Sequence, residues 1–150
     1  MKRGIVGYHK DERDDWVAEL DCCHNQHVRH DPPFQNRPWV TTESGRAEKL
    51  GLQLDCVLCD RFELPEGLTA YKQTPEFNEE TIPAGLQGDH ATRRGVWGLI
   101  HVLEGSLEYR ALDIVRQLDS TEPGVVVPEM PHSVSPMGPV RFYVEFHRRD

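Results

Sequence analysis

The chain has 150 residues and a formal net charge of −8, with 28% charged and 37% hydrophobic residues, as in ordinary globular proteins. No apolar run approaches the roughly 20 residues that span a bilayer, and the first nine residues lack the apolar stretch of a secretory signal. Neither half of the chain is basic, which argues against general nucleic-acid binding. We therefore expect a cytoplasmic protein without a membrane partner, in which thiols stay reduced.

The N-terminal part begins with two short strand-like runs, residues 5–9 and 16–20, separated by a polar segment. This pattern predicts a β-hairpin that delivers Cys22 at the end of its second strand. Further on, the prolines at positions 32, 33 and 38 are incompatible with a regular helix or a central strand between them.

A short helix is predicted next, over residues 43–50. Thr42 is its expected N-cap, and Gly51 is a plausible stop after its last turn. The helix would return the chain to Cys56.

All four cysteines lie within the first 60 residues, as the pair Cys22-Cys23 and as Cys56-x-x-Cys59, and histidines follow the first pair. Thiolates and imidazoles at such spacings are typical of a tetrahedral zinc site. The preferred ligand set is Cys22, His24, Cys56 and Cys59, with His27 as the alternative to His24. Four protein ligands would leave no open position, so the Zn²⁺ would be structural.

Three other interpretations of the cysteines stay open: reduced core thiols, disulfides and a redox pair. The zinc interpretation has independent support from size. A segment of about 60 residues with few large apolar side chains usually needs a metal or a disulfide to fold stably.

From residue 61 onward the pattern changes to short β-like runs separated by Gly and Pro turns. This pattern predicts a small β-sandwich or barrel without a long helix. The chain is thus expected to be mainly β, with a zinc-stapled hairpin module at residues 1–60 and a β-barrel at residues 61–150. The runs are residues 69–72, 81–82, 96–103, 106–111, 124–127 and 140–146.

Residues 20–33, 36–40 and 56–59 together resemble a small bacterial domain of unknown function. Its pattern is roughly Cys-Gly-His-x-Gln-His-Val-Arg-His, followed later by Cys-x-x-Cys. Cys23 stands where this family has glycine, which favours Cys22 over Cys23 as the ligand.

Residues 61–150 resemble the cupin-like domain associated with tellurite-resistance proteins. The resemblance implies a jelly-roll barrel that often holds a metal on inward-facing histidines. In some proteins this domain precedes a methyltransferase, but this sequence has no nucleotide-binding glycine loop, so methyl transfer is not carried over. The matching stretches are residues 64–65, 71–77, 83–86, 89–90, 95–98, 102–105, 131–132 and 141–146.

Position within the cupin pattern leaves His90 and His132 as the ligands of a second divalent metal, with Glu145 to complete the group. Strand alternation places His101 on the opposite face from the pocket. Lys72 is a candidate for binding an anionic ligand, although most lysines simply lie on the protein surface. The alternative is that His90 and His132 are ordinary loop or turn histidines in a metal-free barrel.

Three classes of function follow. The first is a metal-binding cupin-like protein that binds an unknown small molecule or oxyanion, or acts in a tellurite-type stress response. The second is a metal-dependent enzyme of the oxygenase or isomerase type that uses the His90/His132 pocket. The third is an interaction protein whose zinc module docks a partner. Barrels of this kind are commonly dimers, so a homodimer is also expected.

Overall fold

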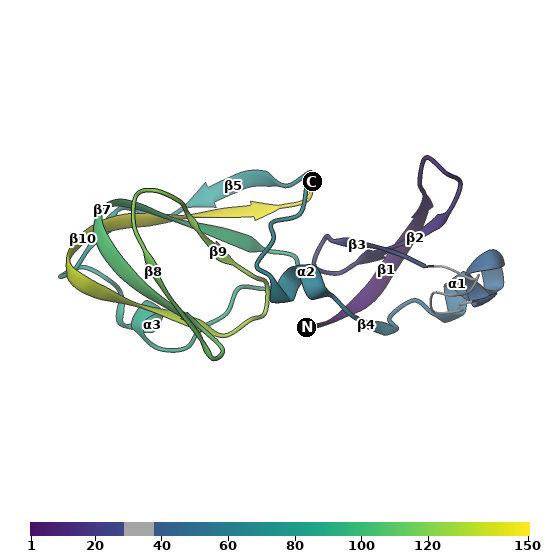
Figure 1. The fold of residues 1–150 in the computed structure, drawn as a ribbon, viewed down its shortest axis with the longest axis horizontal. Helices are drawn as coiled ribbons and strands as arrows, with labels where there is room; N and C mark the ends of the chain where they lie inside the picture. The colour runs from purple at the N-terminus through teal and green to yellow at the C-terminus, as the bar shows by residue number, and fades with distance from the viewer. Residues whose placement is uncertain (29–37) are drawn as a thin grey trace. The chain divides into compact units, whose positions relative to one another are not determined.

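The computed structural model describes residues 1–28 and 38–150. The chain divides into two compact units, Met1–Arg61 and Phe62–Asp150 (Figure 1). The irregular backbone predicted between Pro32 and Pro38 lies outside the described residues. Among the described helices, none has both the length and the apolar composition that crossing a membrane requires.

The first unit is built on a four-stranded antiparallel sheet in the order β3-β2-β1-β4. The predicted hairpin is confirmed: β1 (Lys2–Lys10) pairs with β2 (Trp16–Leu20), and Lys10 lies opposite Trp16. The outer strands are β3 (Asn25–His27) and β4 (Gln53–Asp55). Ile5 and Leu20 are paired across the hairpin and are both buried, so they contribute to a small core.

Short helical segments complete this unit: η1 (Pro38–Thr41), α1 (Glu43–Glu48) and α2 (Val57–Asp60). The helix predicted over residues 43–50 is confirmed, although it ends two residues early. Thr42 caps it as expected, because its hydroxyl oxygen accepts a hydrogen bond from the Gly45 N–H at 3.0 Å. Gly51, with φ of +87°, lets the chain turn back into β4.

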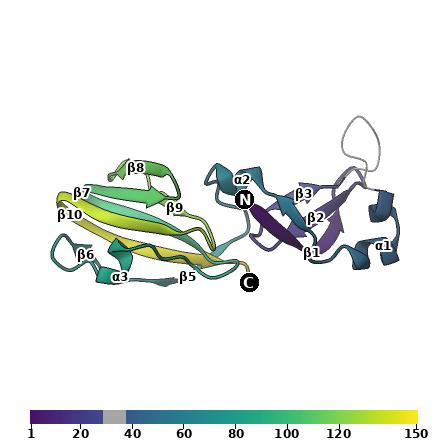
Figure 2. The same cartoon turned by 90° about the horizontal axis from the view of Figure 1, so that it is seen from below.

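The second unit is one antiparallel sheet in the order β5-β10-β7-β8, with β6 added to β10 and β9 added to β7 (Figure 2). Two long strands at its centre, β7 (Trp97–Ala111) and β10 (His132–Arg148), pair along most of their length. The remaining elements are β5 (Thr69–Gln73), β6 (Phe77–Asn78), α3 (Ala84–Gln87), β8 (Ile114–Leu118) and β9 (Gly124–Val126).

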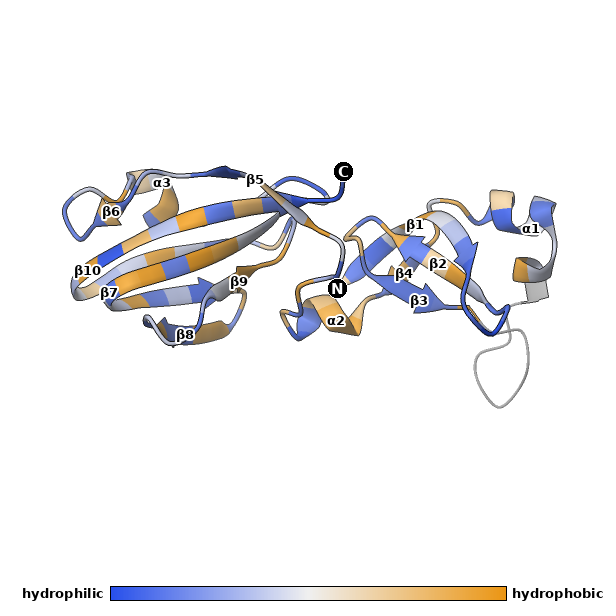
Figure 3. Cartoon of the chain, turned by 90° about the horizontal axis from the view of Figure 1, so that it is seen from above, coloured by the Kyte–Doolittle hydropathy of each residue, from blue (hydrophilic) through white to orange (hydrophobic). Residues whose placement is uncertain are grey.

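Alternation along the central strands builds the core of this unit. Figure 3 shows hydrophobic and hydrophilic positions alternating along β7 and β10. Ile100, Tyr109 and Phe142 are among the buried side chains that result. The mainly β expectation is confirmed, but no closed barrel is detected among the strands of residues 62–150, because β5 and β8 remain at opposite ends of the strand order.

Strand lengths differ most from the prediction at Gly105. The runs predicted at residues 96–103 and 106–111 form the single strand β7, which passes through Gly105 at φ of +77°. A Cβ atom there would collide with the Pro139 carbonyl oxygen on β10, so glycine allows the two strands to approach. The sequence pattern also missed β8 and the first half of β10, whereas residues 81–82 form no strand.

Candidate metal centre

Two of the predicted zinc ligands come from the tight turn between β2 and β3. Cys22 and His24 flank Cys23, whose N–H donates to the Leu20 carbonyl at 2.9 Å, while the Leu20 N–H donates to the His24 carbonyl at 2.9 Å. Cys23 takes the strained left-handed conformation that this turn requires, with φ of 75°. The turn thereby brings the side chains of Cys22 and His24 together.

The other two ligands are carried by α2, with Cys56 at its N-cap and Cys59 within it. Strand β4 pairs with β1, and the Cys56 N–H donates to the Met1 carbonyl at 2.8 Å. Because β1 also pairs with β2, this one strand positions both the turn and α2.

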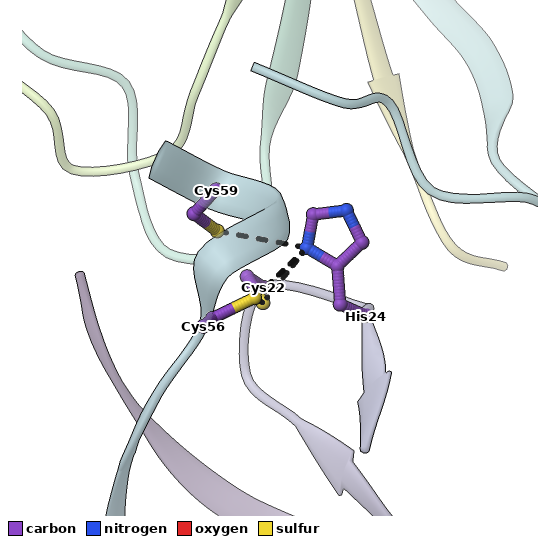
Figure 4. Close-up of side chains that lie close together, drawn as sticks. All are labelled: Cys22, His24, Cys56 and Cys59. Carbon is purple, nitrogen blue, oxygen red and sulfur yellow. Dashed lines mark hydrogen bonds between the residues drawn. The ribbon is translucent and has the colours of Figure 1, made fainter. Parts of the chain in front are cut away.

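The four side chains converge on one point (Figure 4). Their ligand atoms all lie within 4.8 Å of one another. The Sγ atoms of Cys22 and Cys56 are 3.8 Å apart. The Nδ1 atom of His24 lies 3.4, 3.3 and 3.6 Å from the sulfurs of Cys22, Cys56 and Cys59. A tetrahedral zinc ion with the usual bond lengths would place its sulfurs about 3.8 Å apart and sulfur and nitrogen about 3.6 Å apart.

Burial and mutual hydrogen bonding also suit a cation. The four side chains are between 0% and 4% exposed. Hydrogen bonds from the Cys22 and Cys59 thiols hold the pKa of Cys56 far below its ordinary value. The bond to Cys56 raises the pKa of Cys22 instead. A dication bound among these buried sulfurs would stabilise their thiolate forms.

The fold separates the alternatives that the sequence left open. His27 is exposed, and its Nε2 lies 2.8 Å from an Asp11 carboxylate oxygen, so the structure brings His24 and not His27 to the cluster. None of the four cysteines, all of them described, forms a disulfide, and Cys23 is only partly buried. Among residues 1–28 and 38–150, this cluster is the one group found in which at least three Cys, His, Asp or Glu ligand atoms lie close enough together to hold a metal ion. The arrangement is consistent with a structural zinc site.

Cys23 permits a stability test of this turn. Replacing Cys23 by glycine should raise the free energy of unfolding by about 1 kcal/mol, because glycine adopts a positive φ without the penalty of a Cβ. Chemical denaturation of the zinc-loaded protein would measure the change. A variant that loses zinc would contradict the assignment of Cys22 as the ligand.

The predicted pocket histidines also lie together, in the second unit. His90 and His132 form an isolated antiparallel bridge, and their ring centroids are 4.0 Å apart. They line a cavity of about 440 Å³ together with Lys72, Arg93 and Phe146. The other lining residues are Tyr71, Leu86, Ala91, Thr92, Val96 and Val126.

Backbone carbonyls orient both rings. The Nδ1 atoms of His90 and His132 each lie 3.0 Å from a carbonyl oxygen, of Gly88 and of Met130 respectively. Because a carbonyl can only accept, each Nδ1 carries the proton, and Nε2 is the remaining nitrogen for a ligand. Burial lowers the pKa of His132 to about 4, against a weaker opposing effect of the Met130 hydrogen bond, so this ring is neutral at pH 7.

This burial predicts acid sensitivity. Above about pH 6.5 His132 is neutral in both states, but between pH 6.5 and 4 only the unfolded chain takes up the proton. The free energy of unfolding should therefore fall over this range by up to about 3 kcal/mol. Denaturation at several pH values should give a shallower slope for His132→Asn than for wild type, and equal slopes would contradict the prediction.

Glu145 is not brought to His90 and His132. Strand alternation on β10 turns Phe146 toward the cavity and Glu145 to the opposite face, where its Oε1 lies 2.7 Å from Nε2 of His147 and 3.5 Å from Nε2 of His101. From the sequence, His101 was predicted on the face opposite the pocket and Glu145 inside the pocket, so the two residues were not paired. Arg93 in the cavity was also missed, although its place three residues after His90 was a usable signal.

Comparison with known proteins gives matches in both parts of the chain. Residues 6–63 match the family described as protein of unknown function (DUF3565), and residues 72–144 match the TehB-like domain. A search of the curated proteins gave no match.

Solved structures match more than half of the chain. The crystal structure of TehB from Haemophilus influenzae is 24% identical with a TM-score of 0.54, and the match covers 56% of this chain and 32% of that one. A protein from E. coli (strain K12) is 25% identical with a TM-score of 0.55, and the match covers 59% of this chain and 97% of that one. These likenesses show a shared fold, and this chain spans only about a third of the TehB chain. The chain therefore joins a DUF3565 domain at residues 6–63 to a TehB-like domain at residues 72–144.

Proposed function

We propose that this protein is a metal-containing binding protein, in which a structural zinc ion holds the first unit together and the second unit binds a small anion. The zinc half rests on the buried Cys22, His24, Cys56 and Cys59 donors and on their zinc-like spacing. Because the protein fills all four positions, the ion would join the β2–β3 turn to α2 and would not meet a substrate. Metal analysis of protein purified under reducing conditions should find one zinc per chain, retained in the His90→Ala/His132→Ala variant.

The anion half rests on the composition of the cavity. Lys72 and Arg93 line it, whereas none of its lining residues, all within the described residues 62–150, is Asp or Glu. This local excess of positive charge stands against a net charge of −8 for the whole chain. The volume of about 440 Å³ suits a small molecule, and an oxyanion or carboxylate is the class that these side chains would bind.

Thermal unfolding tests this assignment with sulfate, phosphate and small carboxylates as probes. At least one probe should raise the midpoint for wild type, and the Lys72→Gln/Arg93→Gln variant should lose the rise. The matched control is Arg110→Gln, which removes an exposed arginine paired with Glu108 outside the cavity. Equal responses of wild type and the double variant would contradict the proposal.

A second candidate is a metal-dependent enzyme of the oxygenase or isomerase type that uses His90 and His132. The observation in its favour is the Nδ1–H···O=C bond of each ring, because metal-binding histidines commonly hold their other nitrogen in this way. Two imidazoles would leave coordination positions open for water or substrate. Metal content per chain that is unchanged in His90→Ala/His132→Ala would exclude this candidate.

Four further expectations stay predictions: a homodimer, a cytoplasmic location, a docking role for the zinc module and a tellurite-type stress response. The docking role has a direct test. A partner captured by wild type should be lost with Cys56→Ser while residues 62–150 remain folded.

A further inference from the structure

The cavity of the second unit brings two cationic side chains together with two imidazoles. Lys72 lies on β5, which pairs with β10, and β10 begins at His132 (Figure 2). His90 and Arg93 lie in the segment between α3 and β7, and the bridge between His90 and His132 joins this segment to β10. All four side chains line the same cavity, so one small ligand can contact both kinds.

Both imidazoles present an unprotonated nitrogen to this ligand. The Nδ1 atoms of His90 and His132 each lie 3.0 Å from a backbone carbonyl oxygen, so each Nδ1 holds the proton of its neutral ring. The Nε2 atom of such a ring can only accept a hydrogen bond. Nε2 of His132 makes no hydrogen bond to a described residue and is not enclosed as a buried unpaired atom, so it is open to the cavity.

The Thr92 hydroxyl is a further acceptor in the same lining. It donates its own proton to the Val96 carbonyl oxygen at 2.7 Å, so its oxygen has only lone pairs left for a ligand. Tyr71 carries the remaining neutral polar group of the lining, and its hydroxyl can donate or accept. The side chains of the cavity therefore combine cationic donors with neutral acceptors.

This combination matches an anion that also carries an O–H group. Its charged oxygens would accept hydrogen bonds from Lys72 and Arg93, while its O–H would donate to an imidazole Nε2. Sulfate has no proton at neutral pH, so it would leave each Nε2 facing an oxygen lone pair, or the ring would first have to take up a proton. Burial lowers the pKa of His132 to about 4, which opposes that protonation. An unpaired acceptor costs binding free energy, so the lining disfavours sulfate.

We propose that the cavity selects anions that carry an O–H group over anions of similar size that lack one, and that His90 and His132 determine this specificity. Hydrogen phosphate and 2-hydroxy carboxylates share the required chemistry. The inference rests on the proposed anion-binding function and names the class of ligand for that cavity. Lys72 and Arg93 attract both kinds of anion, so the contributions of charge and of O–H recognition are separable.

Two matched pairs of anions test the selection. At pH 7 phosphate retains a proton that sulfate lacks, and lactate has a hydroxyl group that propionate lacks. In calorimetric titrations of the zinc-loaded full chain at constant ionic strength, the first member of at least one pair should bind at least about tenfold more tightly than the second. The pair that shows the difference identifies the ligand as an inorganic oxyanion or a hydroxy acid. His90→Phe keeps an aromatic ring without the acceptor and should abolish the difference.

His101→Phe is the matched control, because His101 lies beside Glu145 and does not line the cavity, so this variant should select as wild type does. Imidazole ¹⁵N spectra of the wild-type protein give a readout that needs no variant to fold. The Nε2 signals of His90 and His132 should move when the selected anion is added and stay in place with its partner.

The outcomes separate this inference from the proposed function. Equal affinities within both pairs, with all binding lost in Lys72→Gln/Arg93→Gln, would overturn the selection and leave the anion cavity intact. Selection that persists in His90→Phe without movement of the two Nε2 signals would overturn the role of the imidazoles. Failure of every anion to bind wild type would overturn the proposed anion-binding function and this inference with it.

Discussion

Serine in place of Cys56 is expected to abolish zinc binding and to unfold residues 1–61. The oxygen of serine is a poor zinc ligand, so the remaining buried donors Cys22, His24 and Cys59 would lose the ion that joins the β2–β3 turn to α2. Structural zinc binding is coupled to folding with an apparent free energy of about 10–16 kcal/mol in small zinc domains, which exceeds the stability of most such modules. The loss should therefore be of the whole fold of the unit and not of a local contact.

Two-dimensional amide spectra with metal analysis would measure this outcome. Signals from residues 1–61 should collapse to the shifts of an unfolded chain, whereas those from residues 62–150 should stay dispersed, because the two units have separate cores. Cys23→Ser is the matched control, since it removes a neighbouring thiol outside the cluster and should keep the zinc. A Cys56→Ser protein that loses zinc yet keeps dispersed signals for Ile5 and Leu20 would refute a structural role for the ion.

Alanine in place of Gly105 should be the most damaging single-methyl change in the second unit. Its Cβ would meet the Pro139 carbonyl oxygen and would also lie 3.0 Å from the Val140 Cα, in addition to the strain of a positive φ. Strain and overpacking together predict a loss of about 3 kcal/mol or more in the free energy of unfolding. Because backbone atoms form the obstacle, no side-chain rotation relieves it.

Gly138 provides a control with the same backbone conformation. Its φ is +76°, close to that of Gly105, but an added Cβ would meet no atom within 4 Å. Gly138→Ala should therefore lose only the strain of about 1–2 kcal/mol. Urea denaturation of both variants measures the difference, and equal losses would show that the close approach of β7 and β10 contributes nothing.

Only part of the candidate zinc site could be predicted from residues that are close together in the sequence. The hairpin, the α1 cap at Thr42 and the Cys-x-x-Cys pair depend on residues close together in the chain, so they can be predicted without knowledge of the fold. The sequence favoured His24 but could not exclude His27, because both follow Cys22 at spacings that zinc sites use. It depends on the turn at Cys23 and on the Asp11 carboxylate, 16 residues from His27, which accepts that ring as a partner.

In the second unit, less of the arrangement could be predicted from the sequence. Its β content and the pairing of His90 with His132 were predictable from alternation and from family resemblance, and the structure brings these two histidines together. The closed barrel was not detected among residues 62–150, and Glu145 went to the other face. Strand parity fixes which residues share a face, but only the register between β7 and β10 decides which faces meet the cavity.

The sequence by itself therefore determined the kinds of ligands, the hairpin and the mainly β character, because these depend on side-chain chemistry and on short-range periodicity. Only the tertiary structure excluded His27 in favour of His24, and only it showed where the cavity of the second unit lies and which imidazoles share Glu145. Those features depend on contacts between residues far apart in the chain. Cys22 and Cys56 are separated by 34 residues, and His101 lies near Glu145 only because β7 pairs with β10. Such contacts leave no periodic trace in the sequence, so local patterns cannot specify them.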